Sequence, residues 1–138
     1  MSNLTDLTLS STLTLSDGVA LTATATELNK LSDMDTPQLL VADGAITVKN
    51  GVCLIAKTVA GVVAATLADP TATTDDYKRL TIISNQAQAN TVTSASSFGG
   101  GGGGEDVATF SGAIGDTLNL MAYQGKWYIT GAHQCTIA

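Results

Sequence analysis

Short β-like stretches recur along most of the chain after residue 40, and they constrain the fold more than any other feature. Runs rich in Val, Ile, Leu and Thr alternate with glycines, prolines and polar turn residues. Regular short strands with such turn signals are typical of an all-β sandwich or barrel. Because aromatic residues make up only 4% of the sequence, the core is expected to be aliphatic. We expect strands at residues 45–48, 52–56, 62–67, 79–83, 91–94, 107–110, 117–123 and 126–130.

Two dipeptides that end in glycine favour hairpins between neighbouring strands. Asn50-Gly51 lies between the first two expected strands, and Asn-Gly is the preferred sequence of a two-residue type I′ turn. Gln124-Gly125 lies between the last two expected strands and predicts a second hairpin. Beyond that turn, alternation places Trp127 and its neighbour Tyr128 on opposite faces. One ring is expected in the core and the other at a subunit interface, with a sugar-binding surface as the alternative for the second ring.

The first 20 residues have a different pattern, which favours an extended arm. The sequence Leu-Thr-Leu-Ser occurs twice, and its period of two indicates β-structure. Such a segment buries little by itself, so we expect it to become ordered by pairing with another chain or with the body. A disordered tail is the alternative. The leucines of the two copies are Leu7, Leu9, Leu13 and Leu15.

Residues 21–37 contain the one good helix signal. Thr24 and Glu27 have the spacing of a capping box, and Leu28, Leu31 and Met34 then follow on one face. A helix of roughly ten residues is too short to be stable alone in water, so its apolar stripe must pack against something. Three copies around a symmetry axis would bury the stripe, and packing on the chain's own β-domain is the alternative. This divides the chain into an arm (1–20), a short helix and linker (21–37), and an all-β domain (38–138).

Charge and hydropathy limit the partners that we expect. The chain has 12 acidic and 6 basic side chains, and no basic cluster of the kind that binds nucleic acid. No apolar run approaches the roughly 18 residues that cross a membrane, so neither nucleic acid nor membrane is an expected partner. The sequence MSNLTDLTLS also lacks the features of a signal peptide. We therefore expect folding in the cytoplasm of the producing cell.

The residue types that usually carry chemistry do not form a known pattern. His133 is the sole histidine and has no nucleophile motif beside it, so we interpret it as a strand-end or interface residue. The glycine run at residues 99–104 is followed by Glu105 and Asp106 instead of the lysine of a phosphate-binding loop, which favours a flexible loop. We expect no catalytic residues, no cofactor-binding residues and no enzymatic activity.

Metal binding is not expected either. Cys53 and Cys135 lie far apart without a CxxC pattern, so zinc is disfavoured. We interpret them as thiols that act as small hydrophobes, with a disulfide within or between subunits as the alternative. Acidic pairs such as Asp75 and Asp76 do not match an EF-hand loop. Solvated turn residues are the default interpretation, and a calcium site in such a loop is the alternative.

Two segments resemble proteins of tailed bacteriophage virions. The phrase VALTATATELNKL at residues 19–31 is similar to segments of phage fibre and head proteins. The stretches ATLADPTATTDDYKRLTIIS, FGGGGGGEDVATF and GAIGDTLNLMAYQGKWYI are similar to a β-module of tailed-phage structural proteins. The resemblance implies a homotrimer on the outer capsid surface of the virion, with the major capsid protein as partner.

The short chain favours one role within that resemblance, a capsid decoration (cement) protein that stabilises the shell. The alternative is a short head or tail fibre that binds host-surface glycan. Under the first role, the expected oligomer interface is the helical stripe of Leu28, Leu31 and Met34. The expected capsid or neighbour-subunit contact is the arm, through Leu7, Leu9, Leu13 and Leu15.

Overall fold

The structure, a computed structural model, describes residues 36–100 and 104–138, and within them it is almost entirely β. The expected all-β class is therefore confirmed, whereas the expected arm and helical stripe lie outside the described residues. The elements in chain order are β1 (Gln38–Leu40), β2 (Gly44–Ile46), β3 (Gly51–Ile55), β4 (Ala64–Leu67), β5 (Arg79–Ser84), β6 (Thr91–Ser94), the 3-10 helix η1 (Phe98–Gly100), β7 (Val107–Phe110), β8 (Thr117–Tyr123), β9 (Lys126–His133) and β10 (Cys135–Ile137).

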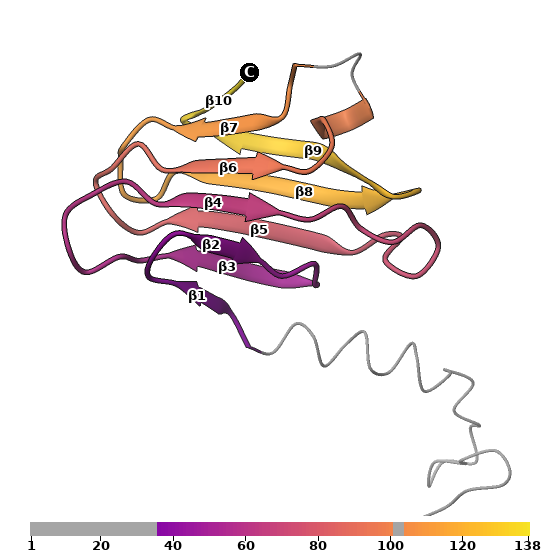
Figure 1. The fold of residues 1–138 in the computed structure, drawn as a ribbon, viewed down its shortest axis with the longest axis horizontal. Coiled ribbons are helices and arrows are strands. Elements are labelled where there is room, and N and C mark those ends of the chain that lie inside the picture. Colours follow the sequence, from indigo (N-terminus) through magenta and orange to yellow (C-terminus); the bar gives the residue numbers. More distant parts are fainter. Residues whose placement is uncertain (1–35, 101–103) are drawn as a thin grey trace, which may run out of the picture.

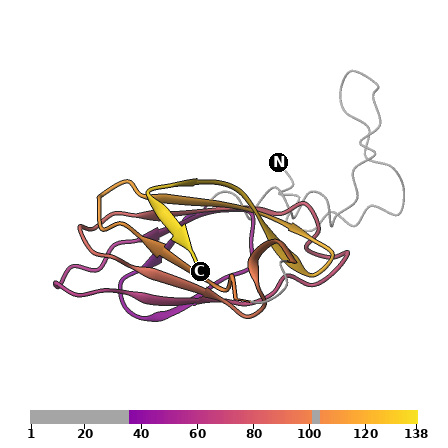
Figure 2. The same ribbon diagram turned by 90° about the horizontal axis from the view of Figure 1, so that it is seen from above.

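The strands form two five-stranded sheets that lie face to face as a sandwich (Figures 1 and 2). One sheet has the order β1-β3-β5-β8-β9, and we call it the first sheet. The second sheet has the order β10-β7-β6-β4-β2. Both sheets are mixed, because parallel pairs at one end give way to antiparallel pairs at the other.

The first six strands wind back and forth between the sheets as a coil. Odd-numbered strands enter the first sheet and even-numbered strands enter the second, so each strand pairs in parallel with the strand two places along the chain. Three turns of chain therefore stack on one another, and Figure 1 shows β1 and β2 at one end of the stack. This arrangement explains why most pairing joins residues that are distant in sequence.

The last strands close the sandwich with antiparallel pairs. β8 and β9 form the hairpin predicted from Gln124-Gly125, with Tyr123 opposite Lys126. Both turn residues have positive φ, 47° at Gln124 and 77° at Gly125, as a type I′ turn requires. In the second sheet, β10 pairs antiparallel with β7.

The predicted hairpin at Asn50-Gly51 is wrong. β2 and β3, which flank this dipeptide, belong to different sheets and do not pair. The Asn50 side chain instead connects two turns of the coil, since its Oδ1 accepts a hydrogen bond of 2.8 Å from the backbone N–H of Arg79 in the next turn. A turn-type dipeptide therefore marks a corner between sheets here.

Other polar side chains join the turns of the coil in the same way. Asp43 accepts from the N–H of Ala64 at 3.0 Å, which connects the first turn to the second. Asp69 accepts from both the N–H and the hydroxyl of Ser96, at 3.0 and 2.6 Å. These bonds satisfy backbone donors where the strands end, and that stabilises the corners.

The core lies between the sheets and comes from alternate residues of nearly every strand. Trp127 is the largest buried side chain at 1% exposed, so the expectation that one ring of the Trp-Tyr pair enters the core is confirmed. Its indole N–H donates to the carbonyl of Ala68 at 3.0 Å, which ties β9 to the residue after β4 in the opposite sheet. Phe98 of η1 is also buried, and η1 lies against β9.

One end of the coil exposes the edge strands β1 and β2. The amide of Gln38 donates to the carbonyl of Ala45 and accepts from the N–H of Thr47, both at 2.8 Å. These are the two bonds that a residue opposite Ile46 would form in an added parallel strand. A side chain of β1 thus covers the edge of β2, while β1 itself remains an edge strand.

Candidate functional site

No metal centre is apparent in residues 36–100 and 104–138. No group of three or more His, Cys, Asp and Glu side chains is placed to hold a metal ion in this part of the chain. His133 is exposed at the end of β9, opposite Thr117. Among the same residues, no helix is long and apolar enough to cross a membrane.

Both cysteines are free thiols. Cys53 is buried in β3, and Cys135 is half-buried in β10 of the other sheet. Burial raises the pKa of Cys53 to about 11, against a smaller opposing effect of Lys49. Burial, with the negative charge of Asp116, likewise raises the pKa of Cys135 to about 11. Both thiols are therefore protonated at neutral pH and unreactive as nucleophiles.

Asp116 is a buried carboxylate with a structural role. It is only 1% exposed, and its Oδ2 accepts hydrogen bonds from the Ser111 hydroxyl at 2.8 Å and from the N–H groups of Gly112 and Ala113 at 3.1 Å. Burial alone would raise the pKa of Asp116, but these hydrogen bonds outweigh it and hold the pKa below its ordinary value. The carboxylate thereby fixes the loop that connects β7 of one sheet to β8 of the other.

All three tyrosines of the chain gather at one corner of the first sheet. The ring centroids of Tyr77 and Tyr123 are 5.7 Å apart, and those of Tyr123 and Tyr128 are 6.4 Å apart. Tyr77 is 69% exposed and Tyr123 36%, so the rings form an aromatic surface that solvent reaches. We call these three residues the tyrosine cluster.

The backbone holds Tyr77 in a strained conformation that brings it to the other two rings. Its φ is 68°, which is rare for a bulky residue and costs about 1–3 kcal/mol. Two backbone hydrogen bonds fix this position, from Tyr77 N–H to the carbonyl of Ala122 at 2.7 Å and from Ala122 N–H to the carbonyl of Lys78 at 2.8 Å. Strain of this kind concentrates at binding sites, where the surrounding structure maintains it.

Two aspartates organise the loop that carries Tyr77. Asp75 pairs with Lys78 at 3.0 Å and accepts from the N–H of Thr71 at 2.6 Å. Burial would raise the pKa of Asp75, but the bonds from Thr71 and Lys78 outweigh it and lower the pKa. Asp76 accepts from the N–H of Gln124 at 2.7 Å, so it connects the loop to the β8–β9 turn. Both side chains thus act as local anchors of this loop.

A polar hollow of about 330 Å³ lies on the outer face of the same sheet, next to the tyrosine cluster. Arg79 is opposite Met121, which is opposite Tyr128, so the hollow and the cluster meet along one row of the sheet. A β-bulge at Asn119/Leu120 leaves the hollow's Thr130 without a residue directly opposite. The hollow is lined by Arg79, Thr81, Asn119, Leu120 and Thr130.

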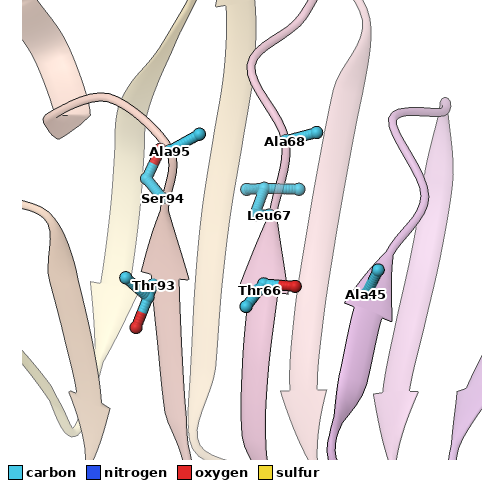
Figure 3. Close-up of a pocket in the computed structure, with 7 residues that line it drawn as sticks. All are labelled: Ala45, Thr66, Leu67, Ala68, Thr93, Ser94 and Ala95. Carbon is cyan, nitrogen blue, oxygen red and sulfur yellow. The ribbon is translucent and has the colours of Figure 1, made fainter.

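A second hollow, of about 320 Å³, lies on the second sheet and is lined mostly by small side chains. Figure 3 shows Ala45, Thr66 and Thr93 on the neighbouring strands β2, β4 and β6, where they are paired in register. Few charged or aromatic groups are available there for a specific contact. This face is therefore a shallow, uncharged surface close to the open end of the coil.

The first sheet instead carries an apolar row at the open end of the coil. Leu39, Leu54 and Ile83 are in register on β1, β3 and β5, and by alternation they point away from the core. Leu39 is 59% exposed, and Val41 just after β1 is 51% exposed. We call Leu39, Leu54 and Ile83 the apolar row, and it lies at the opposite end of β5 from Arg79.

The remaining residues singled out in the sequence are dispersed. The glycine run begins in η1, where Gly99 has φ 69°, and a hydrogen bond of 2.8 Å from Phe98 N–H to the Glu105 carbonyl spans the run. The tyrosine cluster as a unit was missed, since Tyr77 is far in sequence from Tyr123 and Tyr128. The one available signal is that Tyr128 alternates with a core tryptophan and must face outward.

Comparison with known protein families and with curated proteins finds no match for this chain.

Proposed function

We propose that this protein is a non-enzymatic capsid decoration (cement) protein of a tailed bacteriophage. It would bind the major capsid protein on the outer surface of the virion as a homotrimer and stabilise the assembled shell. A protein that binds the assembled lattice but not the isolated subunits shifts the equilibrium toward the lattice by mass action.

The observation that carries the proposal is the open end of the coil, where an edge strand and the apolar row coincide. An edge strand offers unpaired backbone groups to another chain, and apolar side chains beside it add contact area. β1, the strand with which the described structure begins, lies at this same end (Figure 1). An arm attached there is well placed to reach a neighbouring subunit or the capsid.

The copy number of the protein in purified particles tests this function. Quantitative mass spectrometry should give a ratio to the major capsid protein that is near one or a simple fraction of it, as expected for a protein spread over the whole lattice. A trace ratio would contradict the proposal and would instead indicate a short head or tail fibre that binds host-surface glycan.

Charges placed in the apolar row should weaken attachment. The double variant Leu39→Lys, Leu54→Lys is expected to bind particles stripped of this protein at least about tenfold more weakly, because an unpaired lysine charge that is buried against an apolar surface loses its hydration. Co-sedimentation with the particles measures the dissociation constant. The matched control is Ala72→Lys, Thr74→Lys, because these two residues are exposed in the loop before β5, at the opposite end of that strand from the row. Equal affinity of both double variants would remove the row from the interface.

A further inference from the structure

We propose that the tyrosine cluster and the adjoining polar hollow form a binding site for an oligosaccharide. The site lies on the first sheet, with Arg79 and the tyrosine cluster at the opposite end of β5 from Ile83, while Thr81 of the hollow is two residues from Ile83 on the same face. It adds a recognition function to the proposed structural one.

The aromatic part suits the face of a sugar ring. A pyranose ring presents a flat array of C–H groups on one face, and such a face stacks on the electron-rich face of an aromatic ring. The rings of Tyr77, Tyr123 and Tyr128 follow one another at 5.7 and 6.4 Å, which makes a continuous surface rather than an isolated ring. Two hydrogen bonds at its border hold that surface in place. The Gln124 N–H donates to Asp76 at 2.7 Å, and the Gln124 side-chain amide donates to the Tyr123 hydroxyl at 3.3 Å.

The hollow supplies the polar groups that would read sugar hydroxyls. Thr81 and Thr130 present hydroxyls, Asn119 an amide and Arg79 a guanidinium, and a volume of about 330 Å³ lies within the range of small-ligand sites. Thr81 donates to Asn119 Oδ1 at 2.9 Å, which leaves the amide N–H₂ of Asn119 oriented as a donor. Within residues 36–100 and 104–138, no carboxylate forms an ion pair with Arg79.

The two parts are spaced for more than one sugar unit. Tyr123 and Asn119 are four residues apart on β8, which corresponds to about 13 Å along the strand. Met121 lies between them on the same face and next to Tyr128 in the sheet. One sugar ring stacked on the tyrosines and a following sugar unit in the hollow would therefore belong to the same oligosaccharide.

The chemistry of the corner disfavours other small ligands. A nucleic-acid strand would meet Asp75 and Asp76 beside the rings in a chain of net charge −6, without a basic patch to offset them. A quaternary ammonium group needs a gap between rings, whereas Tyr77 and Tyr123 contact each other with an angle of 40° between their planes. A neutral saccharide meets neither obstacle.

The test is binding of the full-length protein to an immobilised array of neutral and acidic oligosaccharides, followed by dissociation constants for the members that bind. The variant Tyr77→Gly removes one ring and at the same time suits the positive φ of this position, so the fold should be retained. We expect binding about tenfold weaker, which corresponds to the loss of one stacked ring. Thr73→Gly is the matched control, since Thr73 lies in the same loop with φ 66° but carries no ring.

Arg79→Gln tests the hollow separately. Its backbone N–H still reaches Asn50, so the variant changes the side chain alone. Weaker binding restricted to acidic members of the array would assign Arg79 to a carboxylate, and weaker binding of all members would assign it to hydroxyls. The proposal is overturned if no saccharide binds, or if Tyr77→Gly and Thr73→Gly bind equally well. Binding of a peptide instead of sugars at this corner would overturn it as well.

Discussion

Replacement of Asp116 by alanine is expected to lower the free energy of unfolding by roughly 3 kcal/mol or more. The substitution leaves the Ser111 hydroxyl and the N–H groups of Gly112 and Ala113 without their common acceptor. Each hydrogen bond to a buried charged group contributes about 1.5–3 kcal/mol, and stranded donors add a desolvation cost. Urea denaturation followed by circular dichroism measures the change.

The same carboxylate should give the protein an acid-sensitive stability. Because the pKa of Asp116 is lower in the folded state than in the unfolded chain, its contribution is complete above the unfolded value, about 4, and is lost as pH falls below it. Asp116→Asn keeps the shape but cannot titrate, so it should flatten the fall in stability below pH ~4. Asp106→Asn, at an exposed position, is the control and should shift stability by no more than about 0.5 kcal/mol. An unchanged acid profile in Asp116→Asn would show that other groups control it.

Trp127→Ala should be the most destabilising substitution in the core, at about 3–5 kcal/mol. The ring is 1% exposed and also donates to the Ala68 carbonyl, so its loss leaves a large cavity and an unpaired acceptor between the sheets. Since domains of this size are stable by about 5–15 kcal/mol, a marked fall in the urea midpoint is expected.

Circular dichroism suits this measurement, because the substitution removes the only tryptophan of the chain. Trp127→Phe separates the two contributions, since it retains much of the apolar volume and loses the indole N–H. It should lie between the parent chain and Trp127→Ala. A loss below 1 kcal/mol in Trp127→Ala would contradict the place of this ring at the centre of the sandwich.

Strand positions were largely predictable from the sequence because they depend on local patterns. Eight expected strands are found within a few residues of their predicted bounds, and the Gln124-Gly125 hairpin is confirmed because its pairing is local as well. The missed strands, β1 and β10, have three residues each. Three residues are too few to establish an alternation between apolar and polar side chains.

Strand pairing was not predictable in the same way. In the coil, the partner of Cys53 in β3 is Ile82 in β5, and no local signal connects residues so far apart. The Asn50-Gly51 dipeptide favours a turn, but whether that turn joins strands of one sheet or of two depends on the distant partners of each strand. The tyrosine cluster depends on the same long-range register, so the sequence around Tyr77 does not predict its contact with Tyr123.

The Gln38 amide caps the edge of β2, and such a cap is compatible with a coil of more or fewer turns. Because the coil repeats one pairing geometry, a turn added or removed between its ends would change the height of the stack by one strand spacing, about 4.8 Å. The antiparallel strands would still close one end, and a single glutamine would still terminate the other by imitating a peptide group. The distance between the open end and the tyrosine corner would thus change by one strand spacing for each added or removed turn, while both ends kept their structure.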